Sequence, residues 1–321
     1  MLKQLLIVCH NYYPASTADA VRMCFMVDTL SEDFQITVLC SSGGEARSNE
    51  KVISMEVNPI MPSSFLGRIR SEVQLYRKYW NLLKRKSFDA YMVSSPPYLS
   101  FLLLRWKLKK RSVNLINDMR DPYPFILGIH PAIQFIISRI ELKLMRSALL
   151  NVFSSKSYTQ YHRNTNGGLK FLYVPNGHTM NTNPPLNQFN TALRIVVLGN
   201  IGKMQDNDSL ARLIKNLTDE GAVEFSIIGS GSEYLDLKNK CAGIDHCTFF
   251  GRIPTNEVEA FLQKADLGLS LRKENSTAEW IEPVRCFEYI GNALPQIIMP
   301  KNSFSQELYQ KGIYASARFF S

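Results

Sequence analysis

Two side chains near the end of the chain have the types and the spacing needed to hold a nucleotide. Arg285 and Glu288 lie three residues apart in the segment PVRCFEYIGNALP, residues 283–295. On a helix this spacing places both on one face, while Phe287 and Ile290 lie on another face that can pack on a sheet. A guanidinium can clamp a diphosphate through paired charge-assisted hydrogen bonds, and a carboxylate can accept hydrogen bonds from two ribose hydroxyls. A surface ion pair explains the same spacing, so the pattern alone leaves both interpretations open.

Glycine-containing loops directly follow three predicted strands in the same half of the chain. They read LGNIGK at 198–203, IGSG at 228–231 and FGR at 250–252. Glycine lets a backbone approach a phosphate or a base closely, and the N-terminus of a following helix offers free N–H groups to an anion. One such loop is typical of a tight turn, whereas three in one domain favour a nucleotide site. The candidate contacts in these loops are Gly199, Asn200, Lys203, Gly229, Gly231, Gly251 and Arg252.

Short apolar runs alternate with helical segments and must position these residues. In the first half the predicted strands are 5–9, 36–39, 90–93, 114–117, 150–153 and 171–174, and in the second half they are 195–198, 225–228, 248–250, 267–271 and 296–299. Continuous apolar strands separated by helices predict parallel sheets covered on both faces. We therefore expect an α/β protein of two tandem Rossmann-like, doubly wound domains, residues 1–178 and 194–321, joined by an Asn- and Pro-rich linker at 179–193. Ligands are expected at the carboxyl ends of the strands.

Taken in order, the motifs of the chain resemble those of GT-B fold retaining glycosyltransferases, the nucleotide-sugar-dependent group that builds capsular and O-antigen polysaccharides. The resemblance covers nearly the whole chain. The matching motifs are Tyr13-Pro14 with Arg22, DMRDPYP at 118–124, VPNG at 174–177, GNIG at 199–202, IGSG at 228–231, FFGRIP at 249–254, ADLGL at 265–269 and the segment 283–295.

The resemblance implies a role for each matching site residue. Arg285 would grip the donor diphosphate, with Lys203 as a second cation, and Glu288 would bind the ribose. Many members carry a second glutamate eight residues earlier; that position is Trp280 here, and the neighbouring Glu279 and Glu282 are the candidates to substitute, with Glu282 assigned to the donor site. The glycine loops would approach phosphate and base. Asp118 and Asp121 would face the acceptor and take part in catalysis.

The charge of the chain is concentrated in its first half. Residues 1–180 hold 23 Lys and Arg against 12 Asp and Glu, a net charge of +11, whereas residues 181–321 hold 14 against 16, a net charge of −2. A basic domain favours an anionic partner such as a phospholipid surface, a phosphorylated substrate or a nucleic acid. No helix-turn-helix, zinc or RNA-recognition pattern accompanies the charge, so a nucleic-acid partner is not expected. The basic amphipathic segment 67–86 is expected to pack on the sheet and to touch anionic lipid headgroups.

The cysteines and histidines do not favour a disulfide framework or a metal site. The six cysteines show no C-x-x-C spacing, and several lie in apolar runs, which predicts buried thiols in a reducing cytoplasm. The five histidines lack ligand spacing, and Asp206-Asn207-Asp208 immediately precedes an apolar helix, where aspartate is a favoured cap. We therefore predict no metal.

These observations predict a hexosyltransferase-type enzyme that moves a sugar from a nucleotide-diphosphate sugar to a lipid-linked or saccharide acceptor. No cofactor is expected beyond the donor substrate, and the expected location is the cytoplasm, peripheral to the inner face of the membrane. Because only 22 residues follow Met299, whereas the family continues further, we expect an incomplete second domain. The alternatives are a truncated, inactive sugar-nucleotide- or polysaccharide-binding protein and a nicotinamide-dependent oxidoreductase. HNYYP at 10–14 argues against the oxidoreductase, because it replaces the G-x-G-x-x-G fingerprint after the first strand.

Overall fold

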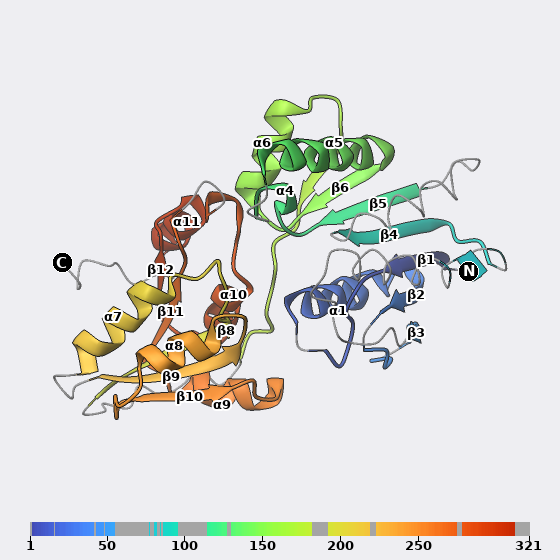
Figure 1. Cartoon of the computed structure of the whole chain (residues 1–321). Helices are drawn as coiled ribbons and strands as arrows, with labels where there is room; N and C mark the ends of the chain where they lie inside the picture. Colours follow the sequence, from blue (N-terminus) through green and yellow to red (C-terminus); the bar gives the residue numbers. More distant parts are fainter. Residues whose placement is uncertain are drawn as a thin grey trace. The chain divides into compact units, whose positions relative to one another are not determined.

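The computed structural model consists of two compact units, Met1–Pro175 and Asn176–Ser321. Their boundary lies a few residues before the predicted end of the first domain at 178. The residues that the structure describes are 2–15, 17–41, 43–47, 49–54, 77, 80–81, 84, 86–95, 114–126, 130–181, 192–218, 223–274 and 278–311. Figure 1 shows the first unit in blue to green and the second in yellow to red.

The first unit is built on a seven-stranded sheet in which all paired strands are parallel, in the order β3-β2-β1-β4-β5-β6-β7. Its strands are β1 (Lys3–Val8), β2 (Phe34–Cys40), β3 (Lys51–Ser54), β4 (Ala90–Ser95), β5 (Asn114–Met119), β6 (Leu150–Phe153) and β7 (Phe171–Tyr173). The helices described in this unit are α1 (Ala18–Leu30), α4 (Tyr123–Ile126), α5 (Pro131–Ser147) and α6 (Lys156–Thr165). The edge strand β3 was not predicted, because its four residues KVIS carry no long apolar run.

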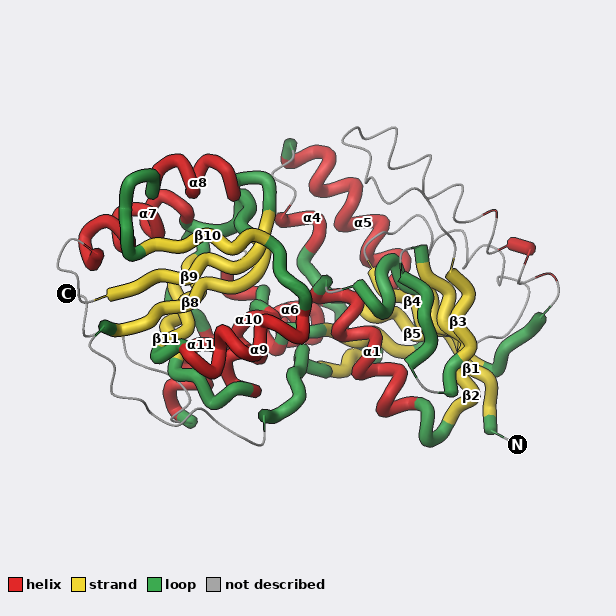
Figure 2. Tube along the Cα trace, turned by 90° about the horizontal axis from the view of Figure 1, so that it is seen from below, coloured by secondary structure: helices red, strands yellow, loops and turns green. Residues whose placement is uncertain are grey.

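The second unit repeats the design with a five-stranded parallel sheet in the order β10-β9-β8-β11-β12. Its strands are β8 (Leu193–Asn200), β9 (Val223–Ser230), β10 (Cys247–Gly251), β11 (Leu267–Leu271) and β12 (Gln296–Met299). Its described helices are α7 (Asn207–Thr218), α8 (Tyr234–Lys240), α9 (Thr255–Lys264), the short 3₁₀ helix η1 (Ala278–Trp280), α10 (Val284–Gly291) and α11 (Ser303–Gln310). Figure 2 shows the strands in yellow and the helices in red.

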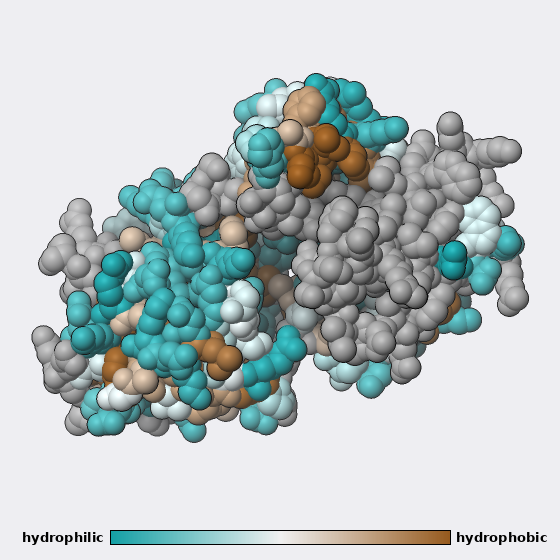
Figure 3. Space-filling model, in the orientation of Figure 1, coloured by the Kyte–Doolittle hydropathy of each residue, from teal (hydrophilic) through white to brown (hydrophobic). Residues whose placement is uncertain are grey.

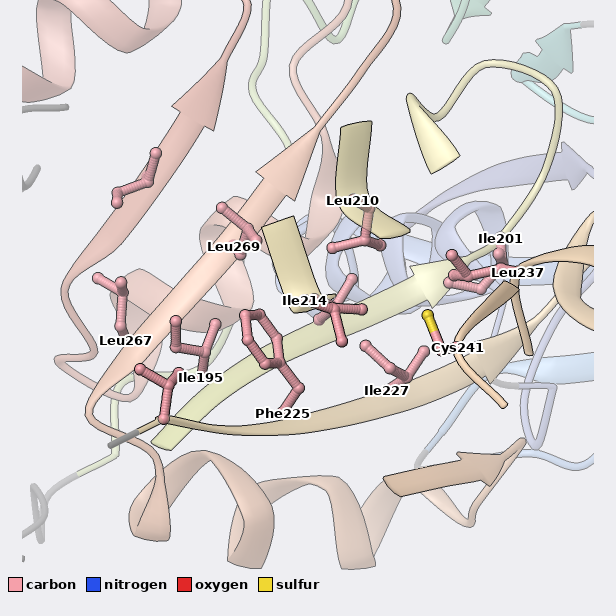
Figure 4. Close-up of a cluster of buried hydrophobic side chains, with 13 residues drawn as sticks. Ile195, Ile201, Leu210, Ile214, Phe225, Ile227, Leu237, Cys241, Leu267 and Leu269 are labelled. Carbon is pink, nitrogen blue, oxygen red and sulfur yellow. The ribbon is translucent and has the colours of Figure 1, made fainter. Parts of the chain in front are cut away.

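Helices cover both faces of the second sheet, as a doubly wound fold requires. Alternate residues of one strand point to opposite faces. Ile195 and Val197 of β8 belong to the core formed with α7 and α8, whereas Val196 and Leu198 belong to the core formed with α9 and α10. Figure 4 shows the first of these cores, with Leu210 among the side chains gathered over the strands. The fold class predicted from the alternation of strands and helices is confirmed.

Each sheet has one point where the direction of winding reverses. In the first unit the chain runs outward from β1 to β3 and resumes at β4 on the other side of β1; in the second it runs outward from β8 to β10 and resumes at β11 on the other side of β8. Open parallel sheets bind their ligands at the carboxyl ends of the strands beside this reversal. In the first unit this edge carries the residues after β1 and β4, and in the second those after β8 and β11.

Some predicted segments lie outside the described residues. These are most of the basic segment 67–86 and positions 182–191 of the predicted linker. Within the part of the chain that the structure describes, no helix is both long and apolar enough to span a bilayer.

Candidate functional site

Helix α10 carries the two residues of the predicted nucleotide site, and Tyr289 holds it against the reversal point of the second sheet. The Tyr289 hydroxyl accepts a hydrogen bond from the backbone N–H of Leu198 (3.1 Å) and lies within hydrogen-bond distance of the carbonyls of Val196 (3.3 Å) and Leu269 (3.2 Å). A Cβ at Gly268 would lie 2.7 Å from the Tyr289 ring, so only glycine permits this packing. One buried tyrosine therefore joins α10 to both β8 and β11.

Arg285 lies one turn before Tyr289, and its guanidinium packs against the end of β8. The residue is only 7 % exposed. A Cβ at Gly199, whose φ is +99°, would lie 3.4 Å from Arg285 Nη2. Nη2 donates to the carbonyl of Asn200 (3.2 Å), and with the Gln205 amide in the orientation that satisfies both of its ends, Nη2 also donates to the Gln205 side-chain oxygen (3.2 Å).

The charge of Arg285 has no contact counter-ion among the described residues, because none of their carboxylates lies within 4.0 Å of it. A mostly buried cation that is held only by neutral oxygens attracts an anion strongly, since the surrounding protein screens its charge less than water does. Arg285 is thus placed to bind a phosphate group at the carboxyl end of β8.

Glu288 follows Arg285 by one helical turn and is partly buried. Burial raises the pKa of its carboxyl group above the ordinary value, and the nearby Arg285 charge lowers it in part. No hydrogen bond or ion pair of its side chain occurs within the described parts of the chain. A carboxylate in this state gains stability from any ligand that donates hydrogen bonds to it, and vicinal hydroxyls of a sugar do so.

The glycines after β8 and β9 allow the two loops to pack backbone against backbone. Gly229 has a φ of +141°, and a Cβ there would overlap the carbonyl oxygen of Gly199. A Cβ at Gly231 would overlap the carbonyl of Ile201 and the side chain of Asn200. These contacts within the protein account for glycine at 229 and 231; their contact with a ligand stays a prediction. Gly251, with a φ of +69°, is more open, the nearest atom to its Cβ position being the Tyr234 hydroxyl at 3.7 Å.

The remaining predicted donor-site residues differ in their exposure. Lys203 and Arg252 are both exposed to solvent. Glu282 is buried, and its backbone carbonyl accepts a hydrogen bond from the side chain of Asn176 (3.3 Å). Contact of these three residues with a nucleotide stays a prediction.

Sequence reasoning missed three polar residues beside Arg285. Gln205 and Asn207 line a small hollow with Arg285; its other walls are Val197, Ile201, Leu210, Leu269 and Leu271. The Asn207 amide nitrogen donates to Glu233 Oε2 (2.6 Å), while its Oδ1 is buried without a partner. Arg272, directly after β11, is buried. Burial raises the pKa of the Cys286 thiol, and the charges of Arg285 and Arg272 lower it in part. The position of the three missed residues just after the strands at the reversal point is the signal that could have found them.

In the first unit Asp118 forms a buried ion pair. It is fully buried at the end of β5, and Arg22 Nη2 on α1 donates to its Oδ1 (2.8 Å) while Arg22 Nε lies 3.1 Å from the same oxygen. Arg22 Nη1 also donates to the carbonyls of Val174 (2.9 Å) and Pro175 (3.1 Å). The pair joins α1, β5 and the segment after β7. The predicted contact of Asp118 with the acceptor stays untested.

Other polar side chains gather around the carboxyl ends of β1 and β5. Asp19 accepts a hydrogen bond from Asn11 (2.8 Å) and lies 3.4 Å from Arg120 Nη1. His10 follows β1. Burial lowers the pKa of its imidazole, and the Asp19 charge raises it in part. Its Nδ1 has no hydrogen-bond partner in the part of the chain that the structure describes. Asp121 is partly exposed. Burial and the Glu141 carboxylate raise the pKa of Tyr158, and the charge of Asp121 adds a small part. Among the residues that the structure describes, no group of three His, Cys, Asp or Glu side chains is arranged to hold a metal ion.

Comparison with known proteins finds likeness at the level of structure. No family model and no curated protein sequence matches the chain. The lipopolysaccharide outer core galactosyltransferase WaaB in its apo form matches with a TM-score of 0.60 at 14 % identity, over 92 % of this chain and 80 % of WaaB. WaaG, a glycosyltransferase involved in lipopolysaccharide biosynthesis, matches with a TM-score of 0.65 at 11 % identity, over 97 % of this chain and 85 % of WaaG. The catalytic domain of starch synthase IV from Arabidopsis thaliana, bound to ADP and acarbose, matches with a TM-score of 0.64 at 11 % identity, over 93 % of this chain and 83 % of the starch synthase chain.

At these identities the likeness concerns the fold. Each of the three solved proteins is a glycosyltransferase or a starch synthase by its own description. With its seven-stranded and five-stranded parallel sheets in tandem, the chain has the fold of the GT-B glycosyltransferases.

Proposed function

We propose that the protein is a glycosyltransferase that transfers a sugar from a nucleotide-diphosphate sugar to a lipid-linked or saccharide acceptor in the synthesis of a cell-surface polysaccharide. The observation that carries this proposal is the position of Arg285, a mostly buried cation that has no contact counter-ion among the described residues and lies at the carboxyl end of β8. The GT-B fold and the three glucan- and lipopolysaccharide-related neighbours support it.

The chemistry of the transfer matches the charges of this site. The bond between the anomeric carbon and the β-phosphate oxygen breaks, and negative charge develops on the departing diphosphate. A new bond forms from the anomeric carbon to the acceptor hydroxyl oxygen, whose proton passes to the departing diphosphate. Arg285 would stabilise the departing diphosphate, and a preorganised donor of this kind typically contributes about 10²- to 10³-fold in rate. Glu288 would accept hydrogen bonds from the ribose hydroxyls, which would lower its raised pKa.

The acceptor would bind to the first unit. Its net charge of +11 over residues 1–180 suits a phosphorylated or lipid-linked acceptor. His10, Asp19 and Arg120 supply hydrogen-bonding groups at the carboxyl ends of β1 and β5. Asp121 follows Arg120 in the sequence. Resemblance to retaining enzymes leads us to propose that the anomeric configuration is kept.

Thermal unfolding with a panel of UDP, GDP, ADP and CMP tests the donor site. A nucleotide at 100 times its Kd adds about 2.7 kcal/mol of stability, which corresponds to roughly 5–10 °C in a unit of this size. Arg285→Ala should weaken binding roughly 10- to 100-fold, because hydrogen bonds to charged groups contribute about 1.5–3 kcal/mol. Lys264→Ala is the matched control, since this exposed lysine ends α9 just before β11, at the amino end of the strands.

The outcomes separate the alternatives. If no nucleotide or nucleotide sugar in the panel moves the midpoint, or if Arg285→Ala binds as well as the wild type, the proposed donor site is wrong. Nucleotide binding without turnover of any sugar nucleotide would favour a non-catalytic binding protein. The anomeric configuration of a first-formed product, measured by proton NMR, decides whether transfer proceeds with retention.

A further inference from the structure

Helix α5 of the first unit exposes a cluster of large apolar side chains. Ile133, Phe135 and Ile136 are 51 %, 59 % and 57 % exposed. In Figure 3 hydrophobic surface gathers in brown over α5. Single exposed apolar residues are common on folded proteins, but a cluster of three within about one helical turn marks a surface that contacts something other than water.

The C-terminal half of α5 anchors the helix. Leu144 and Met145 are buried there, and the buried Glu141 accepts a hydrogen bond from the Tyr158 hydroxyl of α6 (2.6 Å). Ile133 lies eleven residues before Leu144, about three helical turns, and therefore on the same side of the helix. Because Leu144 is buried and Ile133 is exposed, the rest of the unit packs against this side of α5 only along the second half of the helix.

The exposed charged residues of α5 are all cations. Arg139, Lys143 and Arg146 are all exposed, and Glu141, the one acidic residue in the sequence of the helix, is buried. The Arg139 guanidinium lies 4.9 Å from the centre of the Phe135 ring, so a charge sits beside the apolar cluster. The exposed surface of α5 thus combines three large apolar side chains with three positive charges and no negative one.

We propose that α5 docks the protein on the surface of an anionic lipid bilayer. Ile133, Phe135 and Ile136 enter the boundary between headgroups and acyl chains, while the cations contact the lipid phosphates, as in amphipathic helices that lie in the interface. The positive charge of this surface favours an anionic bilayer over a second copy of the chain. A second copy of the chain would bring the same three cations against these three, whereas an anionic bilayer attracts all of them.

Flotation of the full chain with vesicles tests this surface without any nucleotide, so its result does not depend on the proposed transferase activity. The vesicles contain equal parts of phosphatidylglycerol and phosphatidylcholine, with phosphatidylcholine alone as the neutral comparison. The wild type should float with the anionic vesicles and lose most binding in high salt. Each cation near such a surface contributes about fivefold in partitioning, so Arg139→Gln/Lys143→Gln/Arg146→Gln should weaken it by on the order of 100-fold.

The apolar variant Ile133→Ser/Phe135→Ser/Ile136→Ser should also lose binding, and should remain folded because its substituted side chains are exposed. Circular dichroism checks the fold. Leu235→Ser/Lys238→Gln, which removes an exposed leucine and an exposed lysine from α8 in the second unit, is the matched control and should float like the wild type. The proposal is overturned if the wild type does not float, if the apolar variant floats as well as the wild type, or if sedimentation shows a dimer that the apolar variant dissolves.

Discussion

The buried pair of Arg22 and Asp118 offers a test that separates a structural role from a catalytic one. The side chains are 3 % and 0 % exposed, and removing one partner leaves the other charge buried without compensation. Such a loss typically costs about 3–5 kcal/mol. In a unit of this size we therefore expect Asp118→Asn to lower the midpoint of thermal unfolding by roughly 6–20 °C. The pair itself need not be strongly stabilising for this to hold, because the cost comes from the charge that is left behind.

A double variant tests the origin of that cost. Arg22→Met/Asp118→Leu leaves no buried charge, so its destabilisation should be smaller than the sum of the single variants by about 1–3 kcal/mol. Arg22→Met alone also leaves the carbonyls of Val174 and Pro175 without their donor, which adds about 1 kcal/mol for each lost hydrogen bond.

Hydrogen exchange followed by mass spectrometry is the appropriate assay, because a chain of two units need not unfold in one step. Loss of protection in peptides from α1 and β5, with peptides from β8 unchanged, would place the effect in the first unit. The reasoning is refuted if Asp118→Asn keeps wild-type protection and midpoint, within about 0.5 kcal/mol. Loss of transfer activity alone in that stable variant would instead indicate that Asp118 acts in catalysis.

Two further predictions concern the second unit. Burial raises the pKa of Glu288, so the folded state favours the protonated carboxyl group. As pH rises from the ordinary glutamate pKa through the raised pKa, the ligand-free wild type should lose stability relative to Glu288→Gln. Below the ordinary glutamate pKa the two proteins should be equally stable. Melting curves across pH measure this, and parallel profiles would contradict it. Gly229→Ala should destabilise the second unit by about 1–3 kcal/mol, because the added methyl group would overlap the Gly199 carbonyl and the φ of residue 229 is +141°. Urea unfolding measures this loss, with Ser232→Ala as an exposed control in the same loop. Equal stability of the two variants would contradict the prediction.

Local patterns in the sequence were sufficient for most of the fold. The strand predicted at 150–153 coincides with β6, and the five strands predicted in the second half correspond to β8–β12. Arg285 and Glu288 could be paired from sequence, because a helix fixes neighbours three residues apart whatever surrounds it. The edge strand β3 escaped prediction because a short strand at the border of a sheet needs little apolar sequence.

Only the tertiary structure decided what these residues contact. The contact of Asp118 with the acceptor stays a prediction, whereas its ion pair with Arg22 is visible only in the structure. The two residues lie 96 positions apart in the sequence, so their pairing depends on how the sheet is assembled. Contact with a ligand was the reason predicted for glycine at 229. The structure adds a reason within the protein, because a Cβ at this position would overlap the carbonyl oxygen of Gly199 on the neighbouring strand. The amphipathic sequence of α5 is compatible with a helix packed along its whole length; the extent of the core beneath it leaves Ile133 exposed. Sequence determines elements through short-range sterics and periodic hydrophobicity, whereas burial and the pairing of distant charges exist only once the chain has folded.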